Sequence, residues 1–200
     1  MGLRLKKDLE GIPTIGFEDI KDKRNIATTR SFPDLLSDLR EIEERVATFA
    51  NHAAEKMRQQ GSECSGAYVF LRNNKYHSND YLKLGGMVFF GFYTSSSIVI
   101  TKKVIEKLRL IYKQGYTYKK AGVVLVGLQS RKDHQLCMFE DENPQHKVLM
   151  KTIDDLNHKY GGGKLKLANQ DIAGTWKMRQ EHLSPQYTTR FEDIIKVKCF

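Results

Sequence analysis

The sequence predicts an α+β fold in which strands and helices follow the order β-α-β-β-α-β within residues 26–128. Apolar residues recur every three or four positions in two long stretches, as they do on the buried face of a helix. Four runs rich in Val, Ile, Thr, Phe and Tyr flank these stretches, which is typical of strands. Hairpin and helix connections in this order predict a mixed sheet with two helices on one face.

The first strand and the first helix follow from residue type and from spacing. Residues 25–32 contain several β-branched residues and favour a strand, which Pro33 should end. Residues 38–60 form the clearest predicted helix, with Ser37 as the expected N-cap and Gly61 as the expected stop. Its predicted inward face consists of Leu39, Ile42, Val46, Phe49, Ala53 and Met57.

The remaining elements of this domain are two paired strands, a helix and a final strand. The strands are predicted at residues 66–72, 87–94 and 116–128, where apolar runs are flanked by polar turns. Ser95–Ser97 should cap a helix that runs to Lys113. The predicted inward face of this helix consists of Ile98, Thr101, Ile105, Leu108 and Ile111 or Tyr112.

The segments outside the domain are shorter and less regular. Residues 1–25 are predicted to lead into the domain, and residues 129–146 lack any periodic pattern, so they are predicted to be a linker. Residues 147–200 are predicted to be a small C-terminal extension. It should begin with a helix that glycines 161–163 terminate, and residues 164–168 alternate like a strand. The inward residues expected for that helix are Leu149, Ile153, Leu156 and Tyr160.

The charge of the chain is strongly positive and unevenly distributed. The net charge is +9 with a pI near 9.4. Residues 26–126 carry 15 Lys and Arg against 9 Asp and Glu, whereas residues 127–146 carry 2 against 4. This pattern favours a polyanionic partner such as nucleic acid, although a generic basic surface would look the same.

The sequence also predicts where the chain resides. The longest apolar run, Met87 to Tyr93, is too short to span a bilayer, and the N-terminus lacks a signal-peptide core. The three cysteines are far apart, so no disulfide framework is predicted. A cytoplasmic, membrane-free location is therefore expected.

No catalytic or metal-binding constellation is predicted. The GxxxxGK[ST], GxSxG and HxxxH patterns are absent, and Asp154 and Asp155 are adjacent on a helix, so they diverge by about 100°. The sequence therefore predicts no catalytic residue, no metal ligand and no cofactor in this chain.

Candidate DNA-contacting residues lie on the predicted strands. Lys119 and Lys120 begin the last strand beside Tyr118, and Arg30 and Arg72 lie on the first and second strands. A sheet face that carries Arg and Lys can bind phosphates along a duplex without reading its sequence. The alternative is that these are ordinary outward strand residues. The β-α-β-β-α-β order also allows an RNA-recognition module, whose third strand stacks bases on aromatic residues.

Several short stretches together resemble the UmuC branch of the Y-family lesion-bypass DNA polymerases. They occur in the same order as in that family, over nearly the whole chain from about residue 9. The stretches are TRSF (29–32), AAEKMR (53–58), YTYKKAGV (116–123), QLCMF (135–139), LMKTIDDLN (149–157) and WKMRQEHLSPQYTTR (176–190).

The resemblance covers only the C-terminal half of that family. It implies that residues 1–25 are the end of the thumb and the linker after it, that residues 26–128 are the DNA-gripping little-finger domain, and that residues 147–200 are the C-terminal extension. The palm, which holds Mg²⁺ in that family, has no counterpart here, so this chain alone is not expected to synthesise DNA. The implied role is error-prone lesion bypass in the SOS response, with the UmuD dimer and RecA as further partners.

The linker contains a candidate clamp-binding motif. The QLCMF stretch resembles the motif by which bacterial polymerases bind the sliding clamp, with Gln135 for hydrogen bonds and Leu136, Met138 and Phe139 for an apolar cleft. The alternatives are that these apolar residues dock on their own domain, or that the chain is a free-standing clamp binder. One departure from the family is Phe89, which lies near the position where the family usually has a Lys. Loss of this DNA-facing charge predicts weaker DNA binding.

Overall fold

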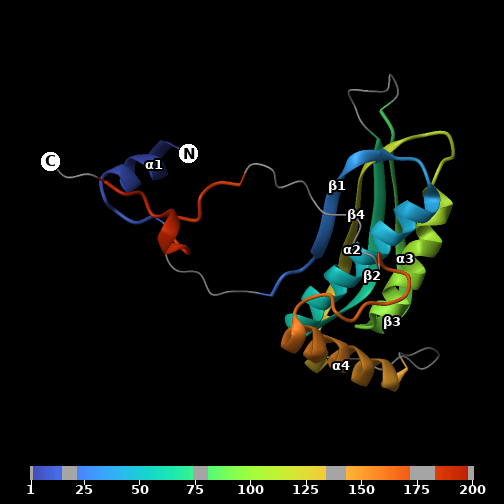
Figure 1. The fold of residues 1–200 in the computed structure, drawn as a ribbon. Helices are drawn as coiled ribbons and strands as arrows, with labels where there is room; N and C mark the ends of the chain where they lie inside the picture. Colours follow the sequence, from blue (N-terminus) through green and yellow to red (C-terminus); the bar gives the residue numbers. More distant parts are fainter. Residues whose placement is uncertain (1, 15–21, 74–80, 134–142, 172–182, 198–200) are drawn as a thin grey trace.

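The computed structural model describes residues 2–14, 22–73, 81–133, 143–171 and 183–197. The central elements, in chain order, are β1 (Ile26–Leu36), α2 (Leu39–Gln59), β2 (Ser62–Asn73), β3 (Lys83–Thr94), α3 (Ser97–Ile111) and β4 (Tyr118–Ser130). The flanking elements are α1 (Gly2–Leu9), the 3₁₀ turns Arg131–Asp133 and Phe191–Asp193, and α4 (Pro144–Tyr160). The predicted α+β class and the β-α-β-β-α-β order are confirmed (Figure 1).

The sheet is antiparallel throughout, so the predicted mixed sheet is wrong. The strand order is β1-β4-β2-β3, and all three neighbouring pairs are antiparallel. The two helical connections do join strands that run in the same direction. Each connection passes over one strand, however, because β4 lies between β1 and β2, and β2 lies between β3 and β4.

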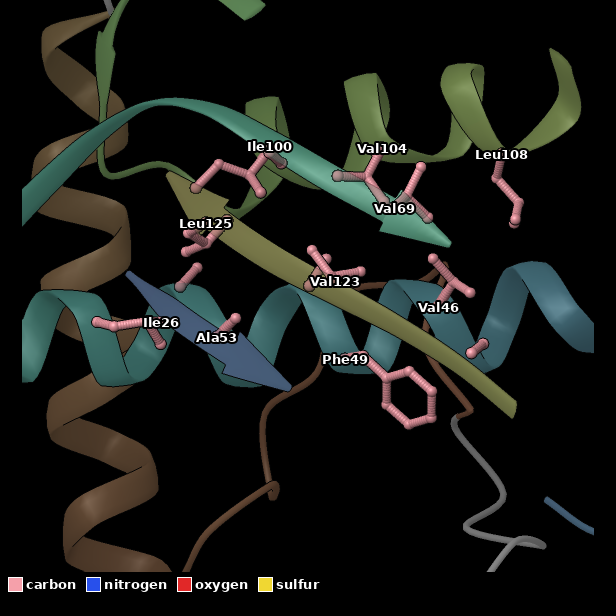
Figure 2. Close-up of a cluster of buried hydrophobic side chains, with 14 of the residues drawn as sticks. Ile26, Val46, Phe49, Ala53, Val69, Ile100, Val104, Leu108, Val123 and Leu125 are labelled. Atoms are coloured by element: carbon pink, nitrogen blue, oxygen red, sulfur yellow. The ribbon is translucent and has the colours of Figure 1, made fainter. Parts of the chain in front are cut away.

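The core lies between the sheet and the two helices that cover one of its faces. Figure 2 shows Val46 and Ala53 of α2 and Ile100, Val104 and Leu108 of α3 beside Val69, Val123 and Leu125 of the two central strands. Phe49 of α2 belongs to the same buried cluster. All nine side chains are buried. Full burial of each larger aliphatic or aromatic side chain contributes about 1.5–3 kcal/mol, so this layer dominates the stability of the domain.

The two helices differ in how well their inward faces were predicted. The predicted face of α2 is confirmed from Ile42 to Met57. The predicted face of α3 is confirmed at Thr101 and Leu108. It is wrong at its other positions, since Ile100 and Val104 are buried while Ile98 and Ile105 are only partly buried. The reason is that apolar residues surround α3 on more than one side, so their spacing does not select a single stripe.

Three local predictions are corrected by backbone hydrogen bonding. Asp38, not Ser37, caps α2, because its carboxylate accepts from the backbone N–H of Arg40 at 3.3 Å. The first strand continues past Pro33 to Leu36, which an edge strand permits because one row of its N–H groups needs no partner. Residues 164–168 form turns, because the Asn157 side chain pairs with the N–H and C=O of Leu165.

Helix α4 packs at the end of the sheet where β2 begins, as Figure 1 shows in orange. Met150 is its one buried residue. Arg58 of α2 donates two hydrogen bonds to the Asp154 carboxylate, at 2.6 and 2.7 Å, and further bonds to Ser95 and Ser97 at the start of α3. The Arg58 side chain is only 6% exposed, so this pair is largely desolvated. In the part of the chain that the structure describes, no helix is both long and apolar enough to span a membrane.

We predict that Asp154→Ala destabilises the protein more than Asp155→Ala. Removing Asp154 leaves the buried Arg58 guanidinium without its carboxylate, which should cost about 2–3 kcal/mol of unfolding free energy. Asp155 is the matched control, because it is adjacent on α4 but exposed, and its loss should cost less than about 0.5 kcal/mol. Urea unfolding measures both values, and equal losses would contradict the assignment of Arg58 and Asp154 as a structural pair.

Candidate nucleic-acid interface

The sheet has a second face that neither helix covers, which we call the open face. The two adjacent glycines of β3 show the alternation directly. A Cβ atom placed on Gly86 would meet Lys107 of α3, whereas one placed on Gly85 would meet the Tyr68 hydroxyl on the other side of the sheet. Because side chains alternate along a strand, the register then assigns every neighbouring residue to one face.

Three cations lie side by side across the open face. Ser31 of β1 pairs with Lys120 of β4, Lys120 pairs with Arg72 of β2, and Arg72 pairs with Lys83 of β3. We call Lys120, Arg72 and Lys83 the basic row. Strands are separated by about 4.8 Å, so the basic row from Lys120 to Lys83 spans about 10 Å.

The basic row has an electrostatic cost that an anion would relieve. Like charges at directly opposed cross-strand positions repel each other. Within the described residues, none of the three cations forms an ion pair with a carboxylate, whereas Arg58, Arg45 and Arg109 on the helices each do. The Nε of Arg72 is buried and has no hydrogen-bond partner in the described structure. The row is therefore suited to bind an extended anion.

Aromatic rings hold Arg72 in place. Its guanidinium carbon lies 5.1 Å from the centre of the Phe70 ring, and Phe70 in turn stacks on Tyr68 at 6.1 Å. Phe70 is flanked by Gly122 on one side and Gly85 on the other. A Cβ on Gly122 would lie 2.7 Å from the Phe70 ring, so the glycine provides the space that the ring occupies.

Beyond these rings the open face becomes apolar. Tyr68 lies between Val124 and Met87, and the next row consists of Val126, Gly66 and Phe89. Phe89 is 71% exposed, which is unusual for an aromatic side chain on a sheet. The open face thus combines a basic row at one end with an apolar surface along the rest.

The structure brings two of the five predicted DNA-contacting residues together and places the other three elsewhere. Arg72 and Lys120 are neighbours in the basic row. Arg30 points to the helix side, where it lines a cavity of about 690 Å³ between α2 and residues 162–171. Lys119 donates a hydrogen bond to the Pro33 carbonyl at 2.7 Å. Tyr118 is fully buried, and its hydroxyl contacts the backbone of Lys113.

Sequence reasoning missed Lys83. The predicted strand began at Met87, whereas β3 begins four residues earlier. The available signal was the alternation of Lys83, Gly85, Met87 and Phe89, which share one face of a strand.

The last candidate site from the sequence is the clamp motif. The predicted clamp-binding residues Gln135, Leu136, Met138 and Phe139 lie outside the described residues. Within the described ranges, no group of three or more His, Cys, Asp or Glu residues could hold a metal ion.

Two family models match this chain. The model of the impB/mucB/samB family C-terminal domain matches residues 23–138, and a model described only as a domain of unknown function matches residues 147–197. Protein UmuC of Salmonella typhimurium is 33% identical over 199 residues, which are 98% of this chain and 47% of UmuC. The chain spans about half the length of the curated relatives it matches.

Two solved structures are also similar. An insertion ternary complex of Dbh DNA polymerase matches 64% of this chain and 35% of its own, with a TM-score of 0.45 and 18% identity. A complex of the beta-clamp processivity factor with the little finger domain of PolIV matches 58% of this chain and 99% of its own, with a TM-score of 0.41 and 9% identity.

We predict that Tyr118 stabilises the fold and makes the free energy of unfolding depend on pH in the alkaline range. Burial raises the pKa of the Tyr118 phenol above its usual value of 10.0. The stability that the neutral phenol contributes is therefore fully present below the usual pKa of 10.0, and it is lost as pH rises through the higher pKa of the folded state. Tyr118→Phe should cost about 1 kcal/mol at neutral pH and lose less stability at alkaline pH than the wild type.

Calorimetry over an alkaline pH series measures this effect. Tyr81→Phe is the control, because Tyr81 is half exposed. An alkaline loss of stability that is identical in the wild type and both variants would contradict the buried position of Tyr118.

Proposed function

The chain belongs to the impB/mucB/samB family through its C-terminal domain, and we propose that it grips DNA and tethers a UmuC-like, Y-family lesion-bypass polymerase to its sliding clamp. In this proposal residues 1–25 are the end of the thumb, residues 26–128 the little-finger domain, residues 129–146 the clamp-binding linker and residues 147–200 the extension. The polymerising activity belongs to a palm supplied by other residues. A role in SOS mutagenesis and a cytoplasmic location are parts of the same proposal.

The basic row is the observation that supports DNA binding. Duplex DNA carries one negative charge per about 1.7 Å of its axis, so three cations across about 10 Å can each face a phosphate. The two lysines of the row can pair with DNA phosphates but have no planar pair of donors with which to read a base edge. Arg72 has such a pair, but its guanidinium is stacked on Phe70. Binding should therefore be largely independent of sequence, as bypass of varied lesions requires.

The apolar part of the open face favours a second candidate. The exposed Phe89 occupies a position where a base could stack, which is how RNA-recognition modules bind single strands. Phe89 lies three rows away from Arg72, however, so the cations and the exposed ring do not form one compact site. We therefore favour a duplex partner and use single-stranded RNA as the comparison in the test.

The clamp contact rests on the sequence of residues 135–139. Leu136, Met138 and Phe139 would fill an apolar cleft on the clamp, and Gln135 would supply hydrogen bonds. Contacts of the extension with the UmuD dimer and RecA are proposed from the family resemblance alone.

We predict that the double variant Lys83→Ala, Lys120→Ala binds primed duplex DNA with a weaker salt dependence. Each lost phosphate contact should reduce the slope of log K against log salt by about 0.9, giving about 1.8 for the pair. Fluorescence anisotropy between low and high salt measures the slope. The matched control is Lys102→Ala, since Lys102 is an exposed cation on α3, which lies on the opposite side of the sheet from the basic row. An unchanged slope, or tighter binding of single-stranded RNA than of duplex, would count against the proposal.

We also predict that Leu136→Ala and Phe139→Ala each weaken binding to the sliding clamp. A buried anchor of this kind is worth about 2 kcal/mol or more, which corresponds to roughly 30-fold in affinity. Isothermal titration calorimetry with the purified clamp measures the effect, and Val148→Ala on the exposed side of α4 is the control. Affinity that survives both motif changes would remove the clamp contact from the proposal.

A further inference from the structure

Strand β3 lies at one edge of the sheet and β1 lies at the other. In the described part of the chain β3 pairs with β2 alone, so no strand pairs with the backbone groups on its outer side. Such a row of N–H and C=O groups is a template for another strand, and proteins usually protect it with prolines, charges or an irregular register. The two edges of this sheet differ in that protection.

The β1 edge is protected in two ways. Pro33 has no N–H group, and its carbonyl accepts a hydrogen bond from Lys119 at 2.7 Å. The pairing of β1 with β4 also shifts in register between Ser31 and Leu36. Residues 83–89 of β3 have neither protection, since their register against β2 is unbroken and they include no proline.

The hydrogen bonds to β2 show which backbone groups of β3 point outward. The N–H of Asn73 donates to the carbonyl of Leu82 at 3.2 Å, so these two residues form a hydrogen-bonded pair where the ladder begins. Hydrogen-bonded and non-hydrogen-bonded pairs alternate along an antiparallel ladder. The even-numbered residues of β3 therefore bond to β2, and the odd-numbered residues direct their N–H and C=O groups outward: Lys83, Gly85, Met87 and Phe89.

A cation flanks this outer edge on each face of the sheet. On the open face, Lys83 lies at the start of β3, and the exposed Phe89 lies six residues further along. On the helix side, Lys107 of α3 lies over the strand, because a Cβ atom on Gly86 would meet its Cε and would lie 3.3 Å from its Nζ. Within the described residues, neither lysine forms an ion pair with a carboxylate.

We infer that the outer edge of β3 binds an extended, acidic peptide segment of a protein partner, which adds a fifth strand to the sheet. The outward backbone groups bond to the segment, as in other complexes that form by strand addition. One carboxylate lies beside Lys83 and another beside Lys107, because opposite charges at opposed cross-strand positions attract. Apolar side chains of the segment cover Met87 and Phe89.

Two other occupants match the edge less well. A DNA backbone would supply charge to the two lysines, but its phosphates have no donors for the outward carbonyl groups. A second copy of this chain would supply a strand, but β3 contains no Asp or Glu, and both copies carry a net charge of +9. Charge complementarity therefore favours an acidic segment.

The register of β3 sets the order of residues in the segment. All three strand pairs of the sheet are antiparallel, so the added strand is expected to run from Phe89 toward Lys83. Apolar residues then oppose Phe89 and Met87, and acidic residues oppose Gly86 and Lys83. The probe is a fluorescently labelled peptide of sequence ITVETTE, which has this pattern.

Peptide binding to the full chain, measured by fluorescence anisotropy, tests the charges. The peptide ITVKTTK, in which lysines replace both glutamates, should bind at least tenfold more weakly. Lys107→Ala should weaken binding of ITVETTE about threefold, as expected for a surface ion pair. Lys102→Ala is the matched control, because it removes an exposed lysine elsewhere on α3. Equal affinities for the two peptides, or equal effects of the two substitutions, would overturn the inference.

Met87→Pro and Met87→Thr test the backbone contact. Both remove the methionine side chain, but only proline removes the outward N–H, and neither removes a bond to β2. Met87→Pro should bind ITVETTE at least tenfold more weakly than Met87→Thr does, and equal affinities would show that the edge does not pair with the peptide. If Met87→Pro does not fold, N-methylation of the peptide's valine removes the opposing donor and decides the result.

Hydrogen exchange of the backbone amides locates the bound segment. Saturating ITVETTE should slow exchange at Met87 and Phe89 by at least tenfold and leave Gly86 and Val88 nearly unchanged, because these two already bond to β2. The same alternating protection with duplex DNA, or a dimer in sedimentation that Met87→Pro dissociates, would assign the edge to another occupant and overturn the inference. Met87 and Lys107 take no part in the proposed duplex and clamp contacts, so their variants leave the proposed function untested and intact.

Discussion

The register between β2 and β4 is the constraint on which the rest of the structure depends. These two strands form the centre of the sheet and pair Val69 with Val123 on one face and Arg72 with Lys120 on the other. A shift of one residue in either strand would move its core side chains to solvent and its cation into the core. Core packing therefore fixes the basic row, since the hydrophobic face cannot form in any other register.

The helices contribute to the proposed site by covering only one face. Because α2 and α3 both pack on the same side, burial of the core leaves the opposite face exposed to a partner. That face carries at one end three cations with no ion pair among the described residues, and at the other end the exposed Phe89. The sheet tolerates this arrangement because the stability of the domain comes from the covered face.

Buried charges have a different role at the other end of the sheet. Arg58 with Asp154, and Glu63 with Arg131 and Lys147, join elements that are far apart in sequence. Replacing such pairs with apolar residues is often neutral or stabilising, so their value lies in the geometry they impose. Here they fix where α4 begins relative to β2.

The sequence alone determined the class of fold, the order of the elements and the inward face of α2, because hydrophobic spacing is a local property that core burial enforces. It also supplied the proposed clamp motif, because a short linear motif is defined by its own residues without tertiary partners. The tertiary structure alone decided that β4 lies between β1 and β2, since strand pairing joins residues that are distant in the chain. That placement put Lys120 beside Arg72, buried Tyr118 and turned Arg30 to the helix side. Which face a strand residue occupies depends on its neighbours in the sheet, and the chain order does not contain that information.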